Sequence, residues 1–342
     1  MKNIFAALLL LVFCAFAAGC KTTSPAESLR RFEYSEPHMG TRFSITLYAP
    51  DQTAADAGAQ AAFARVAALD HMMTDYDPKS ELMQLCLHPA GQPRHVSPEL
   101  FELIAESIRV TRETGGAFDI TVGPFVRAWR AARKSGVLPT PDQIAGMRKS
   151  IGIDKLRLDA HERTITLLAP DMRLDLGGIA KGYAADAALN VLRKLGIHRA
   201  LVAASGDIAI GDAPPGKAGW TVGIEALDGL PNELARKVTL RNAGVSTSGD
   251  TSQHVEINGV RYSHIIDPAT GLGLTNHIQV TIIGPNATTT DGLDTPLDIM
   301  GVKRAIEFVD ARPKLAALVV STDASGKHVI ASRRFQERFG SK

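Results

Sequence analysis

The sequence predicts an α+β fold, and three observations support this prediction. Long helical stretches and strand-like runs are mixed irregularly along the 342 residues, without the regular strand–helix repeat of α/β proteins. Several strand-like runs are joined by tight turns, which favours antiparallel pairing. The composition is that of a soluble globular protein, and no internal repeat or low-complexity linker divides the chain. We therefore expect mixed, mostly antiparallel sheets packed against helices.

The amino terminus predicts a leader and not a part of the fold. Lys2 is followed by the apolar run Ile4–Ala18, which is too short to span a membrane and is typical of a signal peptide. Small residues before Cys20 are typical of a bacterial lipoprotein cleavage site, after which Cys20 carries the lipid; the alternative is ordinary cleavage with Cys20 unmodified. The predicted organisation is a signal peptide, a lipid-anchored tether and a folded domain: residues 1–19, 20–31 and 32–342.

Net charge and cysteine content argue against nucleic-acid binding and against an intramolecular disulfide. The net charge of +2 gives no indication of nucleic acid as a partner. Cys14 is lost with the signal peptide and Cys20 carries lipid, so Cys86 has no partner for an intramolecular disulfide. Because Cys86 lies between two leucines, we interpret it as a small buried hydrophobic residue and not as a nucleophile.

Alternation and helix caps mark the elements of the first half. The stretch Phe32–Tyr48 alternates from Arg42 onward and predicts the first strands. The alanine-rich stretch Ala54–Met73 predicts a helix, which ends at a polar turn containing Tyr76. The next elements are two capped helices, starting at Ser97–Pro98 and at Thr140, and a hairpin of residues 155–159 and 164–169.

The second half predicts a central helix and many strands. Apolar residues recur at three- and four-residue spacing from Ala184 to Leu195, and Gly196 ends this helix. Asn258–Gly259 is a strong signal for a two-residue hairpin turn. Residues 304–310 predict a further helical segment. The predicted strands are residues 200–204, 220–225, 237–240, 254–257, 260–266, 279–283, 316–321 and 328–331, with one more directly after Asp207.

The most informative stretch is Asp175–Asp186, where a short apolar run breaks at paired glycines and turns into the central helix. The first amides of a helix are unpaired and the helix dipole is positive there, which favours anions. Lys181, three residues after Gly178, adds a positive charge. The alternative is a tight turn with a solvated lysine. The spacing matches neither the dinucleotide-binding fingerprint nor a P-loop.

Two other stretches carry residues suited to catalysis. Asp291 and Thr295 are four residues apart and would share one face of a helix, where their oxygens suit Mg²⁺. The alternative is that Thr295–Pro296 starts a helix, with Asp294 favoured by its dipole. His264 ends a predicted strand and is either a general base or a structural histidine.

The segment Ser246–Asp250 is interpreted as a loop of small polar residues that either contacts phosphate or only forms a turn. Together with the stretches above, it resembles one family, the ApbE-type FAD:protein FMN transferases, which are bacterial periplasmic lipoproteins. The similarity follows the family's order over most of the mature chain. The motifs that carry it are Met39–Thr41, Tyr76–Pro78, Gly115–Asp119, Asp175–Gly182, Ser205–Asp207, Ser246–Asp250, His264–Pro268 with Thr270–Gly271, and Asp291 with Thr295.

The resemblance implies a two-lobed α+β fold with FAD, the substrate, held in a cleft between the lobes. It also implies Mg²⁺ as cofactor and His264 as the catalytic base. The residues that match FAD-contacting positions of the family are Met39, Tyr76, Ala117, Phe118, Asp119, Asp175, Lys181 and Ile266. Those that match its Mg²⁺ ligands are Gly178, through its backbone carbonyl, Asp291 and Thr295.

The implied reaction transfers FMN from FAD to a threonine or serine hydroxyl of an acceptor protein and releases AMP. The implied acceptors are subunits of membrane redox complexes or flavin-dependent reductases. With the lipid anchor, this implies a location at the periplasmic side of the inner membrane. The outer membrane is the alternative, because Lys21 and not an aspartate follows Cys20.

Four residues depart from the family's pattern. Ser205 replaces a glycine, Ala203 replaces an asparagine, and Asp294 and Pro296 replace small alanines. None of them removes a metal ligand or His264, so we expect an active enzyme whose metal preference can differ. Two alternatives stay open: a metal-dependent FAD pyrophosphatase, in which water replaces the acceptor hydroxyl, and a lipoprotein that binds FAD without cleaving it.

Overall fold

The structure is a computed structural model that describes residues 29–227, 234–249, 254–323 and 325–340. The predicted signal peptide, Cys20, most of the predicted tether and Asp250 lie outside these ranges. The first strand begins at Arg30, two residues before the expected start of the folded domain. Within the described ranges, we find no helix with the length and apolar character needed to cross a membrane.

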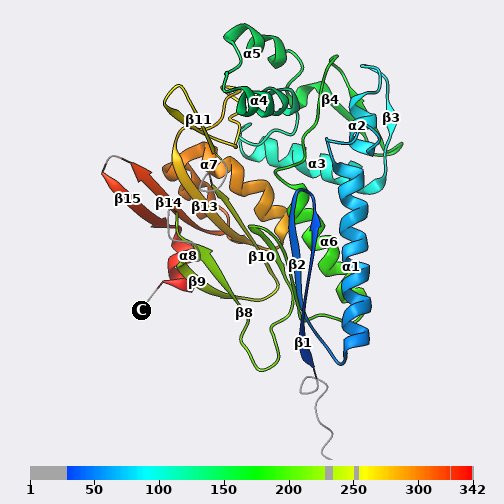
Figure 1. Ribbon diagram of the computed structural model, residues 1–342, viewed down its shortest axis with the longest axis vertical. Coiled ribbons are helices and arrows are strands. Elements are labelled where there is room, and N and C mark those ends of the chain that lie inside the picture. The colour runs from blue at the N-terminus through cyan, green and yellow to red at the C-terminus, as the bar shows by residue number, and fades with distance from the viewer. Residues whose placement is uncertain (1–28, 228–233, 250–253, 324, 341–342) are drawn as a thin grey trace, which may run out of the picture.

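An eight-stranded sheet organises the molecule (Figure 1), and all its neighbouring strands are antiparallel, as the sequence predicts. The alternation expected from Arg42 onward is confirmed, because Phe43, Ile45 and Leu47 are fully buried on one face. In spatial order the strands are β1 (Arg30–His38), β2 (Thr41–Ala49), β6 (Ala200–Ala204), β7 (Asp207–Ile210), β10 (Ala243–Gly249), β13 (His277–Gly284), β14 (Ala316–Asp323) and β15 (Gly326–Ala331).

Three long helices contribute to the main core against one face of this sheet: α1 (Gln52–Met73), α6 (Ala180–Lys194) and α7 (Ala287–Asp310). The predicted helix from Ala54 to Met73 is confirmed by α1. The opposite face packs on a two-stranded ribbon and a short helix. These are β8 (Trp220–Glu225), β9 (Leu234–Leu240) and α8 (Arg333–Phe339).

A smaller lobe has its own hydrophobic cluster, formed around Phe125, Trp129 and Ile266. It contains α4 (Gly123–Ser135), α5 (Pro141–Arg148) and the hairpin β11 (His254–Ile257) and β12 (Val260–Ser263). The hairpin turn is confirmed, with φ of +54° at Asn258 and +75° at Gly259. The remaining elements are α2 (Glu81–Cys86), β3 (Arg94–His95), α3 (Pro98–Glu113), the 3-10 turn Ile153–Lys155, β4 (Leu156–Asp159) and β5 (Thr164–Leu167).

Several local expectations are wrong, and the causes are long-range contacts or missing caps. Ser246–Gly249 is not a loop but part of β10, because neighbouring elements satisfy its small polar side chains: Ser246 Oγ lies 2.9 Å from Thr290 Oγ1. Thr295–Pro296 does not start a helix. Instead α7 begins at Ala287, where the Asn286 side chain accepts a hydrogen bond from the Thr289 amide.

The short run before the paired glycines is not one of the named strands, and Arg173 in it forms an isolated bridge to Val122. The helix α4 was not expected from the sequence. Its N-cap residue, Val122, makes no side-chain capping bond, and the signals that the sequence does offer are Pro124 in the first turn and Gly136 at the C-cap.

Candidate active site

A pocket of about 740 Å³ lies where the turns between strands of the large sheet meet the helices α1, α4, α6 and α7. This volume is within the range of small-molecule sites. The lining comes from segments far apart in the sequence: residues 39–41, Asp70, residues 73–76, Arg130, residues 175–178, Ala180, Lys181, residues 205–207, residues 247–249, His264, Asp291, Asp294 and Thr295.

Two tight turns bring backbone to the pocket. Met39 and Gly40 join β1 to β2 with positive φ values of +49° and +70°, and the Met39 amide donates a 2.7 Å hydrogen bond to Asp70 Oδ2. Ser205 joins β6 to β7 with a φ of +58°, a conformation that costs less for glycine than for serine. The next residue, Gly206, has no room for a Cβ, which would lie 2.8 Å from the Thr247 carbonyl oxygen.

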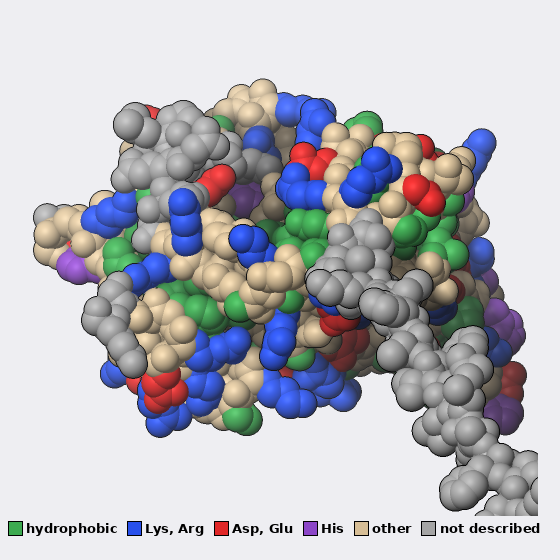
Figure 2. Space-filling view, turned by 90° about the horizontal axis from the view of Figure 1, so that it is seen from below, with side chains coloured by type: hydrophobic (Ala, Val, Ile, Leu, Met, Phe, Trp, Pro, Cys, Tyr) green, Lys and Arg blue, Asp and Glu red, His purple; other side chains and the backbone are tan. Residues whose placement is uncertain are grey.

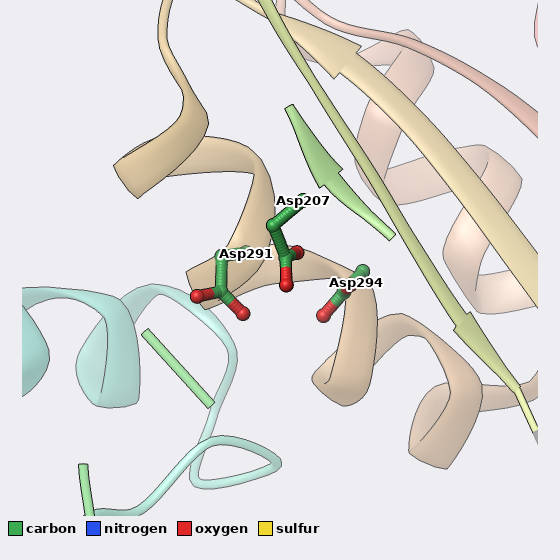
Figure 3. A group of neighbouring side chains, drawn as sticks. All are labelled: Asp207, Asp291 and Asp294. Carbon is green, nitrogen blue, oxygen red and sulfur yellow. The ribbon is translucent and has the colours of Figure 1, made fainter. Parts of the chain in front are cut away.

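Three buried aspartates point toward one another at the base of the pocket (Figure 3). They are Asp207 at the start of β7 and Asp291 and Asp294 on α7, and one oxygen of each lies within 4.8 Å of the others. Lys181 forms an ion pair with Asp207, and its Nζ lies 3.5 Å from Asp291 Oδ1. The second oxygen of Asp291 accepts a 2.7 Å hydrogen bond from the Gly182 amide, which ties α7 to the start of α6.

The electrostatics of this cluster favour a bound cation. Burial raises the pKa of Asp291 to about 7, with the charge of Asp207 adding to the effect and Lys181 opposing it. Burial also raises the pKa of Asp294 well above its ordinary value, helped by its two acidic neighbours. Burial opposes the charge of Lys181, but the nearby carboxylates outweigh it, so the pKa of Lys181 is raised. Three acidic groups thus share one ammonium.

The residues present fit a Mg²⁺ ion. Gly178, Asp291 and Thr295, the three predicted ligands, all line the pocket and offer only oxygen donors. Asp207 Oδ1 is buried without a hydrogen-bond partner among the described residues, which leaves one lone-pair donor for a cation. Asp294 faces the same centre. The sequence named Asp207 only as part of a motif and did not predict it beside the predicted metal ligands.

Arg130 and Tyr76 form the exposed end of the pocket. The Tyr76 side chain is 76% exposed, and the Arg130 guanidinium lies 4.4 Å from its ring centroid. Arg130 also pairs with Asp75 and, at 3.3 Å, with Asp175. Burial raises the pKa of Asp175, and Asp75 adds to it, while the Gly177 amide and Arg130 counteract the shift. Sequence reasoning missed Arg130, which lies on the unexpected helix α4.

The pocket brings together most of the predicted site residues. Met39, Tyr76, Asp175, Lys181 and His264 line it, and His264 is half-buried just after β12. Four residues predicted to contact FAD do not belong to this lining within the described part of the chain: Ala117, Phe118, Asp119 and Ile266.

The contact of these four residues with FAD stays a prediction. Phe118 is buried beneath Gly178, where a Cβ would lie 3.3 Å from its ring. Asp119 accepts hydrogen bonds from the amide and hydroxyl of Thr121, at 2.8 and 2.6 Å. Ile266 is buried in the cluster of the smaller lobe.

The interpretation of Cys86 as a buried hydrophobic residue is confirmed. Its side chain is 8% exposed, and its Sγ accepts a hydrogen bond from the Leu174 amide. Burial raises the pKa of the thiol to about 11, so it stays protonated at neutral pH and is a poor nucleophile.

Comparison with known proteins is consistent with this geometry. A family model described as the ApbE family matches residues 39–319. The chain is 30% identical over 336 residues to the FAD:protein FMN transferase of Vibrio cholerae, covering 97% of this chain and 98% of the relative. It is also 30% identical to the FAD:protein FMN transferase of Salmonella typhimurium, covering 97% and 95%.

Solved structures share the fold. The apo form of the Pseudomonas stutzeri flavinyl transferase ApbE superposes with a TM-score of 0.82 at 27% identity, covering 92% of this chain and 98% of that one. The ApbE protein of Thermotoga maritima superposes with a TM-score of 0.80 at 28% identity, covering 92% and 100%.

Proposed function

Because this chain belongs to the ApbE family, whose curated relatives are FAD:protein FMN transferases, we propose that it transfers FMN from FAD to a threonine or serine hydroxyl of an acceptor protein, with Mg²⁺ and with release of AMP. The observation that carries the proposal is the meeting of Lys181, Asp291, Thr295 and His264 in one pocket, although they come from separate segments. That set provides a cation site, a phosphate-binding charge and a base.

Each residue has a distinct task in the proposed reaction. Lys181 and the positive end of the α6 dipole hold negative charge on the pyrophosphate. His264 accepts the proton of the acceptor hydroxyl, and the hydroxyl oxygen bonds to the phosphorus on the FMN side. The bond between this phosphorus and the oxygen that leaves with AMP breaks. Tyr76 offers a flat ring of the substrate an exposed stacking surface.

The metal would be held by Asp291, Thr295 and the Gly178 carbonyl, with Asp207 and Asp294 close by. When bound, Mg²⁺ neutralises pyrophosphate charge and makes the attacked phosphorus more electrophilic. Asp294 adds negative charge relative to the alanine typical of the family. It would therefore strengthen divalent-cation binding.

The cellular setting is part of the same proposal. The lipoprotein-type sequence before Cys20 supports anchoring by a lipid on the periplasmic side of a membrane. The acceptor would then be the periplasm-facing subunit of a membrane redox complex or a flavin-dependent reductase.

Mass spectrometry of an acceptor tests the transferase directly. The mature protein is incubated with FAD, Mg²⁺ and a threonine-bearing acceptor domain, and AMP and FMN are assayed in parallel. An acceptor heavier by one FMN residue, together with AMP, is the expected result. Free FMN and AMP beside an unmodified acceptor would favour the FAD pyrophosphatase instead, and intact FAD would favour a carrier.

Asp291→Ala should abolish this turnover and leave the fold intact, because it removes a metal ligand and creates only a small cavity. Asp142→Ala, in the exposed first turn of α5, is the matched control and should keep wild-type activity. Undiminished Mg²⁺-dependent activity of Asp291→Ala would remove this residue from the metal site.

A further inference from the structure

One end of the molecule, opposite the pocket, is strongly basic. We define the basal face by five segments: residues 30–31, 49–52, 193–199, 211–219 and 241–242. Contacts join these segments. Arg30 pairs with Ala49 across β1 and β2, and Arg199 donates a hydrogen bond to the Ala213 carbonyl. Asn242 contacts both Arg193 and Asp212. Figure 2 looks onto this end of the molecule from below.

The charge of the basal face contrasts with that of the rest of the chain. Its segments contain seven basic residues and two acidic ones, a formal charge of +5, whereas the whole chain carries +2. The remaining sequence is therefore formally −3. The basic residues are Arg30, Arg31, Arg193, Lys194, Arg199, Lys217 and Arg241, of which all but Arg193 and Arg199 are exposed.

We propose that the basal face docks on the anionic phospholipid headgroups of the membrane that holds the lipid anchor. The described chain begins at this face, since Arg30 is the first residue of β1. The nine residues from Cys20 to Ser28 span at most about 30 Å when fully extended, so an anchor on Cys20 would keep the basal face near the bilayer. Basic side chains within a Debye length of about 8–10 Å are attracted to such a surface.

This orientation determines where the active site lies. The pocket is lined by the Met39–Gly40 turn, at the far end of β1 from Arg30. Nine strand residues at about 3.3 Å each separate the two ends by roughly 25–30 Å. Docking on the basal face would hold the pocket that far above the lipid, at the height of an acceptor domain that protrudes from the membrane. The inference rests on the proposed lipid anchor, but the surface chemistry can be tested without the lipid.

Vesicle binding tests the basal face. The probe is an acyl-free chain from Lys21 to Lys342, which keeps every described element, and vesicles of phosphatidylcholine with or without phosphatidylglycerol. We expect binding to the anionic vesicles only, weakening with salt. The triple variant Lys194→Glu, Lys217→Glu and Arg241→Glu should bind at least about ten-fold more weakly.

The matched control makes the same change of charge at the other end of the molecule. Arg133→Glu, Lys134→Glu and Lys149→Glu alter exposed residues of the α4–α5 lobe (Figure 1) and should keep more of the vesicle binding. Equal loss in both triple variants would overturn the proposal, because net charge alone would then explain binding. Equal binding to neutral and anionic vesicles would also overturn it.

A solution assay separates this inference from the proposed reaction. Neither triple variant alters the pocket lining, so both should transfer FMN to a soluble acceptor at the wild-type rate. Absence of transfer in the wild type would refute the proposed function but leave the vesicle result interpretable. As a second measurement, a fluorophore on Arg241→Cys of the lipidated chain should lie closer to a lipid-borne energy acceptor than one on Lys149→Cys; the reverse order would contradict the orientation.

Discussion

Lys181 determines the charge balance of the pocket. It is the cation that the structure places against Asp207 and Asp291, and it lies in the first turn of α6, where the helix dipole already favours anions. A substrate pyrophosphate entering this pocket would meet the negative charge of the buried acidic cluster. Lys181 would counter that repulsion before the reaction begins as well as during it.

We therefore expect Lys181→Ala to weaken FAD binding more than it slows turnover. Loss of a charge-assisted contact corresponds to about 1.5–3 kcal/mol, or about ten-fold to a hundred-fold in affinity. FAD affinity by fluorescence titration and kcat for FMN transfer measure the two effects separately. Lys194→Ala, exposed at the other end of α6, is the control. A reduced kcat with unchanged FAD affinity would contradict a ground-state role.

At the scale of elements, the contact between α6 and α7 positions the metal site. Gly182 allows this contact, because a Cβ there would lie 2.3 Å from the Ala287 carbonyl oxygen and 2.7 Å from the Asp291 Cβ. Its amide also donates the hydrogen bond that orients Asp291. The position of the acidic cluster thus depends on a glycine outside it.

Gly182→Ala should push α7 away from α6 and cost about 1–3 kcal/mol of folding free energy, because the added methyl group overpacks the contact. The displacement of Asp291 should also weaken Mg²⁺ binding, measured by calorimetry. Gly146→Ala in α5 has open space around its Cβ and should stabilise the protein slightly. A Gly182→Ala protein with wild-type melting temperature and metal affinity would show that the helices accommodate the methyl group.

Elements with local signals were predicted well from the sequence. The capping box at Thr140 and the Asn258–Gly259 turn both formed as expected, since the atoms that specify them lie within a few residues. The strand β10 was mistaken for a loop because its stability comes from pairing with β7 and β13. Arg130 was missed although its helix has local signals, a proline in the first turn and Gly136 at the C-cap, and its pairing with Asp175 is a long-range contact that no local signal predicts.

At the scale of the whole molecule, the acidic cluster imposes a dependence of stability on pH. Asp207 comes from the β6–β7 turn and Asp291 and Asp294 from α7, so only the complete fold holds their charges together. The sequence predicted Asp291 through its motif but not the cluster, because the approach of Asp207 depends on the packing of α6 and α7 against the sheet. In the unfolded chain these carboxyls are separated and ionise at ordinary pH values.

The metal-free protein should therefore lose stability as pH rises from about 4 to about 7. The pKa of Asp291 rises on folding from 3.8 to about 7, and that of Asp294 rises as well, so the folded state binds more protons in this window. Stability is greatest below the unfolded pKa and decreases through the folded one, by an amount on the order of a few kcal/mol.

Thermal unfolding in a chelator across this window measures the effect. Mg²⁺ should restore stability at neutral pH but do little in acid, where protons compete for the same oxygens. Asp294→Asn removes one buried titrating group with little change in volume, so its unfolding temperature should depend less on pH than that of the wild type. The opposite outcome would be a metal-free wild type that becomes more stable toward neutral pH, with the same pH dependence as Asp294→Asn. Ionisation of the buried carboxyls would then not destabilise the folded state.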